Sequence, residues 1–138
     1  MTLAFAGTIP EPRVACLRER ITELRTDPIP LVLDRLGHFA SAQVTWIGPR
    51  QPPAALEELA GRAARLCTDC GIRVDTGTFR PHVTLRRFAQ PPEHQVASPP
   101  VTWEAADVVL IESGRAGNPG PYRVLARAGI SSSRPPES

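Results

Sequence analysis

The chain carries the stretch Arg80-Pro81-His82-Val83-Thr84-Leu85, and its pattern predicts a strand with two different faces. The proline restricts the residue before it to an extended conformation, which favours a strand at this point. Because alternate side chains of a strand share a face, His82 and Thr84 should point the same way. Val83 and Leu85 should point the other way, into the core. The first pair combines an imidazole that titrates near neutral pH with a hydroxyl group, and such groups can bind a phosphate and move protons.

A His-x-Thr triplet does not by itself identify a functional site. Strands with this pattern are common, and their histidine is often structural or merely exposed. Arg80, Arg86 and Arg87 lie close by in the sequence and add the positive charge that a phosphate site needs. From the residues alone, two hypotheses stay open: a phosphate site at His82, and a histidine without a chemical role.

Two amphipathic helices are predicted in the first half of the chain. The first begins near Pro12 and ends at Asp27-Pro28. The second follows the prolines at 52–53 and stops at Gly71. Their apolar residues recur at helical spacing: Val14, Leu17, Ile21 and Leu24 in the first helix, and Leu56, Leu59, Ala63 and Leu66 in the second.

Short strands are predicted for much of the remaining chain. They cover residues 2–7, 29–34, 42–48, 72–74, 82–87, 101–103, 108–112 and 122–126. We expect 29–34 and 42–48 to form an antiparallel pair around a bend at 36–38. Residues 91–100 are predicted to be a polar, proline-rich loop, and 114–120 a glycine-rich turn between the last two strands.

The composition sets the class of protein. At 138 residues, with 41% hydrophobic residues, 16 prolines and 10 glycines, the chain favours one mixed α+β domain over a helical bundle. A net charge of +2 does not indicate a nucleic-acid partner, although all 16 basic residues are arginine. The sequence shows no membrane span and no signal peptide, so we expect a cytoplasmic protein without a membrane partner. The odd number of cysteines, 3, favours reduced thiols over a disulfide framework.

The residues around His82 resemble a known family. Residues 79–87 closely resemble the second His-x-Thr motif of the 2H phosphoesterase superfamily, in particular the bacterial RNA 2′,3′-cyclic phosphodiesterases, or 2′-5′ RNA ligase family. Residues 44–48 resemble the family's strand ahead of its helix, and 111–122 resemble its closing hairpin. The resemblance implies a two-lobed, pseudo-twofold α+β fold in which antiparallel sheets line a central cleft and the helices lie outside.

The resemblance also implies that the first lobe is incomplete. Residues 1–5 resemble the tail of the family's first His-x-Thr motif with Thr2 on its threonine, so the first histidine would fall directly before Met1. We therefore expect an N-terminally truncated domain over residues 1–130 that lacks a strand and a helix, roughly 30 to 40 residues. Residues 131–138 have nothing to bury and are expected to form a disordered tail.

By the same resemblance, His82 is the catalytic acceptor that activates water, Thr2 and Thr84 hold the phosphate, and Arg87 contacts it. The implied reaction hydrolyses 2′,3′-cyclic phosphodiesters of RNA ends or small nucleotides to 2′-phosphomonoesters, with two histidines and neither metal nor cofactor. Losing one proton-transfer group typically costs about 10²- to 10⁴-fold in rate. The alternative function is therefore a nucleotide- or RNA-end-binding module that lacks the first catalytic histidine.

The remaining candidate residues favour structural roles. Cys67 and Cys70 form a single Cys-x-x-Cys at a helix end without a second pair of ligands, so a zinc or redox-active thiol protein is the third hypothesis only. His38 and His94 fall in predicted bends or loops without partners, and we expect them to be solvated. Trp46 lies in the middle of a strand pattern and is expected in the core rather than as a base-stacking platform.

Overall fold

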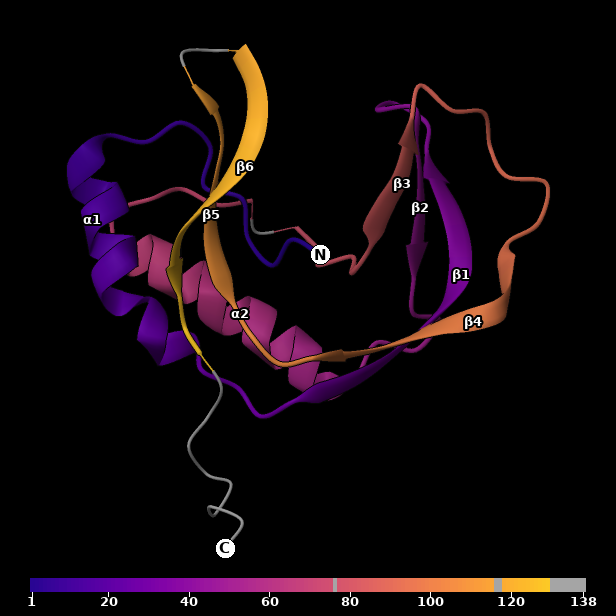
Figure 1. Ribbon diagram of the computed structural model, residues 1–138, viewed down its shortest axis with the longest axis horizontal. Helices are drawn as coiled ribbons and strands as arrows, with labels where there is room; N and C mark the ends of the chain where they lie inside the picture. The colour runs from indigo at the N-terminus through magenta and orange to yellow at the C-terminus, as the bar shows by residue number, and fades with distance from the viewer. Residues whose placement is uncertain (76, 116–117, 130–138) are drawn as a thin grey trace, which may run out of the picture.

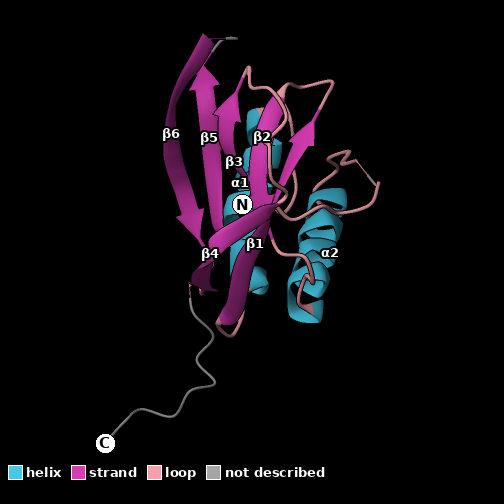
Figure 2. Ribbon diagram, turned by 90° about the vertical axis from the view of Figure 1, so that its right-hand side faces the viewer, coloured by secondary structure: helices cyan, strands magenta, loops and turns pink. Residues whose placement is uncertain are grey.

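A four-stranded antiparallel sheet, a two-stranded hairpin and two helices make up the fold (Figure 1). The computed structural model describes residues 1–75, 77–115 and 118–129. The elements are α1 (Glu11–Arg20), the 3₁₀ helix η1 (Ile21–Leu24), β1 (Ile29–Phe39), β2 (Val44–Gly48), α2 (Ala54–Asp69), β3 (Val83–Arg87), β4 (Val96–Ala105), β5 (Val109–Arg115) and β6 (Asn118–Arg127). The order in the larger sheet is β3-β2-β1-β4, and β5 pairs with β6. The hairpin stands opposite β1–β3, with α1 beside it and α2 behind (Figures 1 and 2).

Both predicted helices are confirmed. Pro12 lies in the first turn of α1, and the chain then tightens into η1. After α2 the backbone turns at Gly71, whose φ of 77° is the left-handed conformation that favours glycine. The amide of Ile72 then donates to the carbonyl of Cys67 at 2.9 Å and closes the helix end. None of the helices among the described residues is long and apolar enough to span a membrane.

The core lies between the helices and the first half of β1. Every apolar residue predicted for the inner face of α2 is buried, and three of the four predicted for the first helix are buried as well. The main buried side chains are Leu17, Ile21, Leu24, Ile29, Leu31, Leu33, Ile47, Leu56, Leu59, Ala63, Leu66 and Ile72. Helical periodicity predicted this face correctly because the tertiary contacts of α1 and α2 follow their apolar stripes.

The predicted bend at 36–38 is wrong. β1 continues through these residues to Phe39, and the turn to β2 comes at 40–43. Gly37 pairs with Trp46 of β2, so the glycine marks a close approach of a side chain rather than a turn. The antiparallel pairing of the two segments is confirmed. The predicted loop 91–100 is shorter than expected, because β4 begins at Val96 and pairs with β1.

Two predicted strands do not form. Residues 2–7 and 72–74 pair with no strand of the described chain, and an extended segment without a ladder partner is not a strand. Leu3, Ala4 and Ala6 instead pack against the core from an irregular segment. The centre of the predicted turn between β5 and β6 and the predicted tail 131–138 lie outside the described residues.

A disulfide overturns the prediction of reduced thiols. Cys16 of α1 bonds to Cys70 at the end of α2, with 5.8 Å between their Cα atoms. The prediction followed from cysteine count and the absence of a signal peptide, whereas the bond follows from the packing of α1 against α2, which brings distant residues together. Cys67 is the remaining cysteine, and it is free and buried.

Reducing the Cys16–Cys70 bond should lower the free energy of unfolding by about 4 kcal/mol, because the bridge joins residues 54 positions apart and restricts the unfolded chain. Denaturant unfolding with and without reductant measures this difference. The Cys67→Ala variant keeps the bridge and should remain sensitive to reductant. Equal unfolding midpoints in both conditions would contradict the expectation.

Candidate functional site

One face of the β1–β2–β3 sheet gathers the polar and aromatic residues around His82. Trp46 of β2 lies opposite Gly37 of β1 and opposite Thr84 of β3, and paired residues of a sheet share a face. Phe39 shares that face because it lies two residues beyond Gly37 on β1. We call this side of the sheet the histidine face. The opposite side carries Leu36, Ile47 and Val83, which are buried or packed against the core.

A β-bulge adds Arg87 to the histidine face. Val44 pairs with Arg87 and Trp46 pairs with Thr84, so three residues of β2 oppose four of β3. Simple alternation would place Arg87 on the side opposite Thr84, and the extra residue reverses this. Thr84 and Arg87 therefore project from the same side of the sheet. Both side chains are exposed.

The same bulge corrects the prediction for Leu85. Its side chain was expected in the core with Val83, but it is 56% exposed. The ladder pairs Thr45 with Arg86 and Trp46 with Thr84, which leaves Leu85 without a partner on β2. A bulged residue leaves the alternation of its strand, so the period of two that holds for Val83 fails at the next apolar position.

The imidazole of His82 is held in one tautomer. Its Nδ1 lies 2.7 Å from the carbonyl oxygen of Arg80, and because a carbonyl only accepts, Nδ1 carries the proton and donates. In the neutral ring the lone pair is then on Nε2, which can accept a proton from water. Phe39 meets the ring edge to face with centroids 5.0 Å apart. The bond to the backbone and the contact with Phe39 together restrict the orientation of the ring.

Trp46 completes the cluster. Its ring lies 6.1 Å from that of His82 and 5.4 Å from that of Phe39. The guanidinium of Arg35 lies 5.7 Å from the centroid of the indole. Trp46 is half-buried and belongs to this aromatic cluster rather than to the main core, where we expected it. Its Nε1 is buried and has no hydrogen-bond partner among the described residues.

Gly37 makes room for the indole. A Cβ atom at this position would lie 2.1 Å from Cζ2 of Trp46, closer than any real contact. Trp46 can therefore lie flat on β1 only because residue 37 has no side chain. Sequence reasoning identified His82 and Thr84 but missed Arg35, Phe39 and this role of Gly37. The available signal was the spacing of Gly37 and Phe39, which lie two apart and so on one face of a strand.

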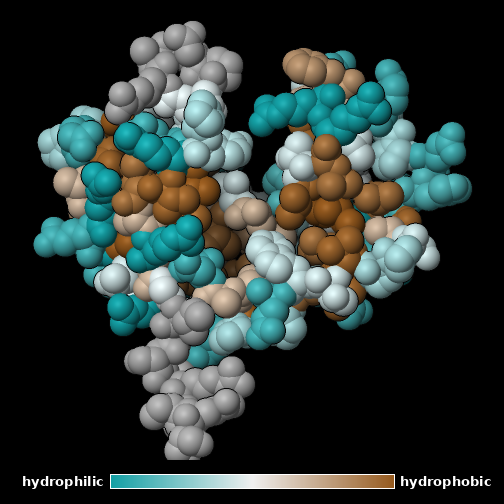
Figure 3. Space-filling model, viewed as in Figure 1, coloured by the Kyte–Doolittle hydropathy of each residue, from teal (hydrophilic) through white to brown (hydrophobic). Residues whose placement is uncertain are grey.

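A notch opens between the hairpin and the strands β1–β3 (Figure 3). The N-terminus lies between the same two parts of the molecule (Figure 1). Thr2 is exposed there. Within the described residues, no hydrogen bond joins Thr2 to His82 or Thr84. The structure thus brings His82, Thr84 and Arg87 together on one face, and it sets Thr2 on a separate segment.

The other two histidines occupy different environments. His38 belongs to β1 and lies opposite Thr45, on the side away from the histidine face. Its Nε2 donates to the carbonyl of Ala89 at 2.8 Å, so the prediction that His38 has no partner is wrong. His38 was placed in the predicted bend at 36–38, but it lies in β1. His94 is exposed in the loop before β4, as predicted.

The cysteines do not form a reactive or metal-binding site. Cys70 is consumed by the disulfide, and burial raises the pKa of the Cys67 thiol above its usual range, which disfavours the reactive thiolate. Among the described residues, no group of three or more histidine, cysteine or acidic side chains is arranged to hold a metal. The third hypothesis, a zinc or redox-active thiol protein, therefore has no support at this Cys-x-x-Cys.

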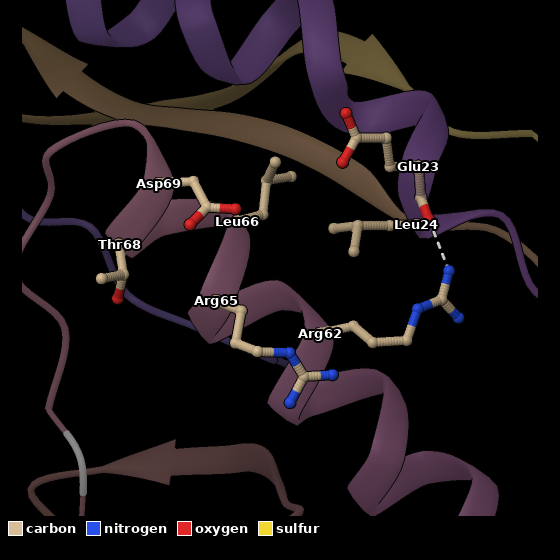
Figure 4. A pocket seen from close by; sticks show the side chains of 7 residues that line it. All are labelled: Glu23, Leu24, Arg62, Arg65, Leu66, Thr68 and Asp69. Carbon is tan, nitrogen blue, oxygen red and sulfur yellow. Dashed lines mark hydrogen bonds between the residues drawn. The ribbon is translucent and has the colours of Figure 1, made fainter.

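A cavity of about 310 Å³ lies elsewhere, between η1 and α2 (Figure 4). Leu24 and Leu66 point into it, while Arg62 reaches out of α2 and donates to the backbone carbonyl of Glu23. The carboxylate of Glu23 is bonded to Arg20 at 2.9 Å, and this hydrogen bond lowers the pKa of Glu23. These groups satisfy each other. The histidine face is the better candidate site because its histidine and arginine are presented on an open surface.

Comparison with known proteins identifies similar chains. A model of the 2′-5′ RNA ligase superfamily matches residues 1–117. The RNA 2′,3′-cyclic phosphodiesterase of Escherichia coli is 33% identical over 89 residues, which cover 64% of this chain and 51% of that protein. The protein of the same name from Aeropyrum pernix is 31% identical over 91 residues, which cover 64% of this chain and 52% of that one. The chain thus spans about half the length of these curated relatives.

Solved structures show the same fold. Escherichia coli LigT complexed with 3′-AMP superposes with a TM-score of 0.77 at 28% identity, covering 94% of this chain and 75% of LigT. LigT complexed with ATP gives a TM-score of 0.78 at 25% identity, covering 94% and 74%. The likeness confirms the predicted α+β fold with antiparallel sheets and outer helices.

Gly37→Ala should displace Trp46 and lower the free energy of unfolding by about 1–3 kcal/mol, because the new methyl group overlaps the indole ring. Thermal unfolding measures the loss, and the NMR signals of the His82 ring should shift because Trp46 contacts it. The matched control is Gly61→Ala in α2, where the nearest atom to a Cβ is a flexible arginine end 3.5 Å away. That helical replacement should raise the stability. A Gly37→Ala protein as stable as wild type would contradict the account of the cluster.

Proposed function

Because the chain belongs to the 2′-5′ RNA ligase superfamily, we propose that the histidine face binds the 2′,3′-cyclic phosphate of RNA ends or small nucleotides. The bound ring is opened by water to a 2′-phosphomonoester. One observation carries the proposal: His82 donates from Nδ1 to the carbonyl of Arg80, which leaves Nε2 as a proton acceptor on the face that also carries Thr84 and Arg87. The names of the relatives, RNA 2′,3′-cyclic phosphodiesterases, support the same chemistry.

His82 is the general base of this reaction. Nε2 takes a proton from water as the oxygen attacks phosphorus, and the bond from phosphorus to the ribose 3′ oxygen breaks. The Arg80 carbonyl stabilises the imidazolium that forms, because it already accepts from Nδ1. Phe39 and Trp46 keep the ring from turning away. The step needs proton transfer and positioning, and imidazole supplies the transfer without a metal.

Thr84 and Arg87 bind the phosphate. The hydroxyl of Thr84 donates to a phosphoryl oxygen, and the guanidinium of Arg87 offers a charge-assisted hydrogen bond to a second oxygen. Arg87 has no ion pair within the described residues, so its charge is available to a ligand. Thr2 takes the matching role to Thr84 from the N-terminal segment, as the family resemblance implies. Structures of LigT with 3′-AMP, ATP and NADP⁺ support a nucleotide as the ligand.

The second candidate function is binding with little turnover. Cyclic phosphodiester hydrolysis also needs an acid that protonates the leaving ribose oxygen. Of the three histidines, His38 is bonded to Ala89 on the opposite face and His94 lies in an exposed loop, so neither stands beside His82 as that acid. For residues 1–138 acting on their own, this observation favours a module that holds the cyclic phosphate and turns it over slowly. Both functions use the same residues for binding.

His82→Ala should reduce hydrolysis of 2′,3′-cyclic AMP by about 10²- to 10⁴-fold, the usual contribution of one general base. Its affinity for the nucleotide should change little, because Thr84 and Arg87 remain. Chromatographic detection of 2′-AMP and calorimetric titration measure the two quantities, with His94→Ala as the matched control. Equal rates of hydrolysis for His82→Ala and wild type would show that His82 is not the general base. Tight binding by wild type with no product would select the binding module.

Arg87→Ala should weaken binding of RNA that ends in a cyclic phosphate by about 10- to 100-fold, because a hydrogen bond to a charged phosphate is lost. The dependence of log K on log salt should also become shallower by about 0.7, the value for one phosphate contact on a single strand. Arg73→Ala, another exposed arginine outside the sheet, is the control and should change neither quantity. An unchanged salt dependence for Arg87→Ala would rule out the contact.

A further inference from the structure

Phe88, the residue directly after β3, holds a conformation that costs free energy. Its φ is 55°, in the left-handed region that bulky side chains rarely adopt. Its side chain is 88% exposed, so burial of the ring does not offset this cost. Strain of this kind persists where the surroundings enforce it, and it concentrates at binding sites. An aromatic ring presented to solvent under strain is therefore a candidate binding element.

Three hydrogen bonds enforce the conformation. The amide of Ala89 donates to the carbonyl of Gln43 at 3.0 Å, and Nε2 of His38 donates to the carbonyl of Ala89 at 2.8 Å. The hydroxyl of Thr45 donates to the carbonyl of Gln90 at 3.2 Å. These bonds fasten the backbone after Phe88 to β1, β2 and the turn between them. The backbone that carries the ring is thus held in place before any ligand arrives, which lowers the entropy cost of binding.

A cavity of about 370 Å³ lies beside Phe88, within the size range of small-ligand pockets. It is lined by Thr45, Arg86, Phe88, Ala89, Gln90 and Pro92. The lining combines an aromatic ring, a guanidinium and an amide side chain. Single-stranded nucleic acids are bound by such sets, because bases stack on aromatic rings and arginine contacts the backbone.

The cavity and His82 lie at opposite ends of β3. This strand begins one residue after His82 and ends one residue before Phe88, so the two lie about 20 Å apart at the usual rise of a strand. β3 is one of the two edge strands of its sheet. Arg87 points to the histidine face, while Arg86 pairs with Thr45 on the other side, next to the cavity. The two arginines therefore offer phosphate contacts on both sides of the edge that a bound strand would cross.

We propose that Phe88 and its cavity bind a nucleobase of single-stranded RNA, upstream of the 3′ end that lies at His82. The site then prefers an oligoribonucleotide to a mononucleotide with the same cyclic phosphate. This inference rests on the proposed function, since His82 fixes the position of the RNA end. The cavity at Phe88 is then a second subsite. It lies on the side of β3 away from the histidine face, several nucleotides from the reacting phosphate.

The test compares Phe88→Gly with Gln43→Gly. Both replace a strained residue by glycine, because φ of Gln43 is 52°, and both should raise the melting temperature. Only Phe88→Gly removes the aromatic ring. It should weaken binding of a six-nucleotide RNA with a 2′,3′-cyclic phosphate by about 5- to 100-fold, the usual effect of losing one base stack. Binding of 2′,3′-cyclic AMP should not change in either variant, and Phe88→Trp should keep the RNA affinity. Fluorescence anisotropy of the labelled RNA, with the nucleotide as competitor, measures these affinities. Thermal unfolding measures the melting temperatures.

The results separate this inference from the function on which it rests. If Phe88→Gly binds the six-nucleotide RNA as wild type does, or weakens the RNA and the mononucleotide equally, the subsite is wrong. The same RNA ending in a 3′-hydroxyl tests the proposed function independently. If wild type binds both RNA ends equally, the cyclic phosphate is not recognised at His82. A more stable Phe88→Gly protein with selectively weakened RNA binding supports the subsite.

Discussion

The pairing of β3 with β2, including its bulge at Leu85, is the constraint on which the candidate site depends. The bulge brings Thr84 and Arg87 onto one face, although their spacing in the sequence would separate them. The strand also starts directly after His82 and so fixes the backbone that precedes it. The carbonyl of Arg80 then selects the tautomer of His82. Backbone pairing, rather than a network of charged side chains, sets the geometry of these groups.

A second constraint supports the first from the far side of β2. Trp46 lies against the bare backbone of Gly37, and its ring borders His82. The glycine therefore acts on the histidine through an aromatic side chain and not through a turn. This position of the indole costs free energy, because its Nε1 is buried without a hydrogen-bond partner among the described residues. Phe88 also costs free energy, in its case through its left-handed backbone conformation. Departures from local preference thus occur around the proposed binding surface, as is common at functional sites.

The sequence predicted the features that depend on local periodicity. Helical spacing placed the buried face of α2, and the period of two placed His82 beside Thr84. It failed at Leu85, because a bulge depends on the partner strand and cannot be read from one strand alone. It also failed at Gly37, since a glycine in a strand pattern can mark either a turn or a close approach. The Cys16–Cys70 bond was missed because it depends on how two helices pack, and the role of Arg87 came from resemblance rather than from spacing.

The tautomer and accessibility of His82 are the central claim, and ¹⁵N NMR of the histidine rings during titration with 2′,3′-cyclic AMP tests it most directly. In the free protein, His82 should be protonated at Nδ1 in its neutral form, because the Arg80 carbonyl accepts there. On addition of the nucleotide, the Nε2 signal of His82 should shift, while that of His38, bonded to Ala89, should stay in place. A His82 ring protonated at Nε2, or one that does not respond to the nucleotide, would contradict the account.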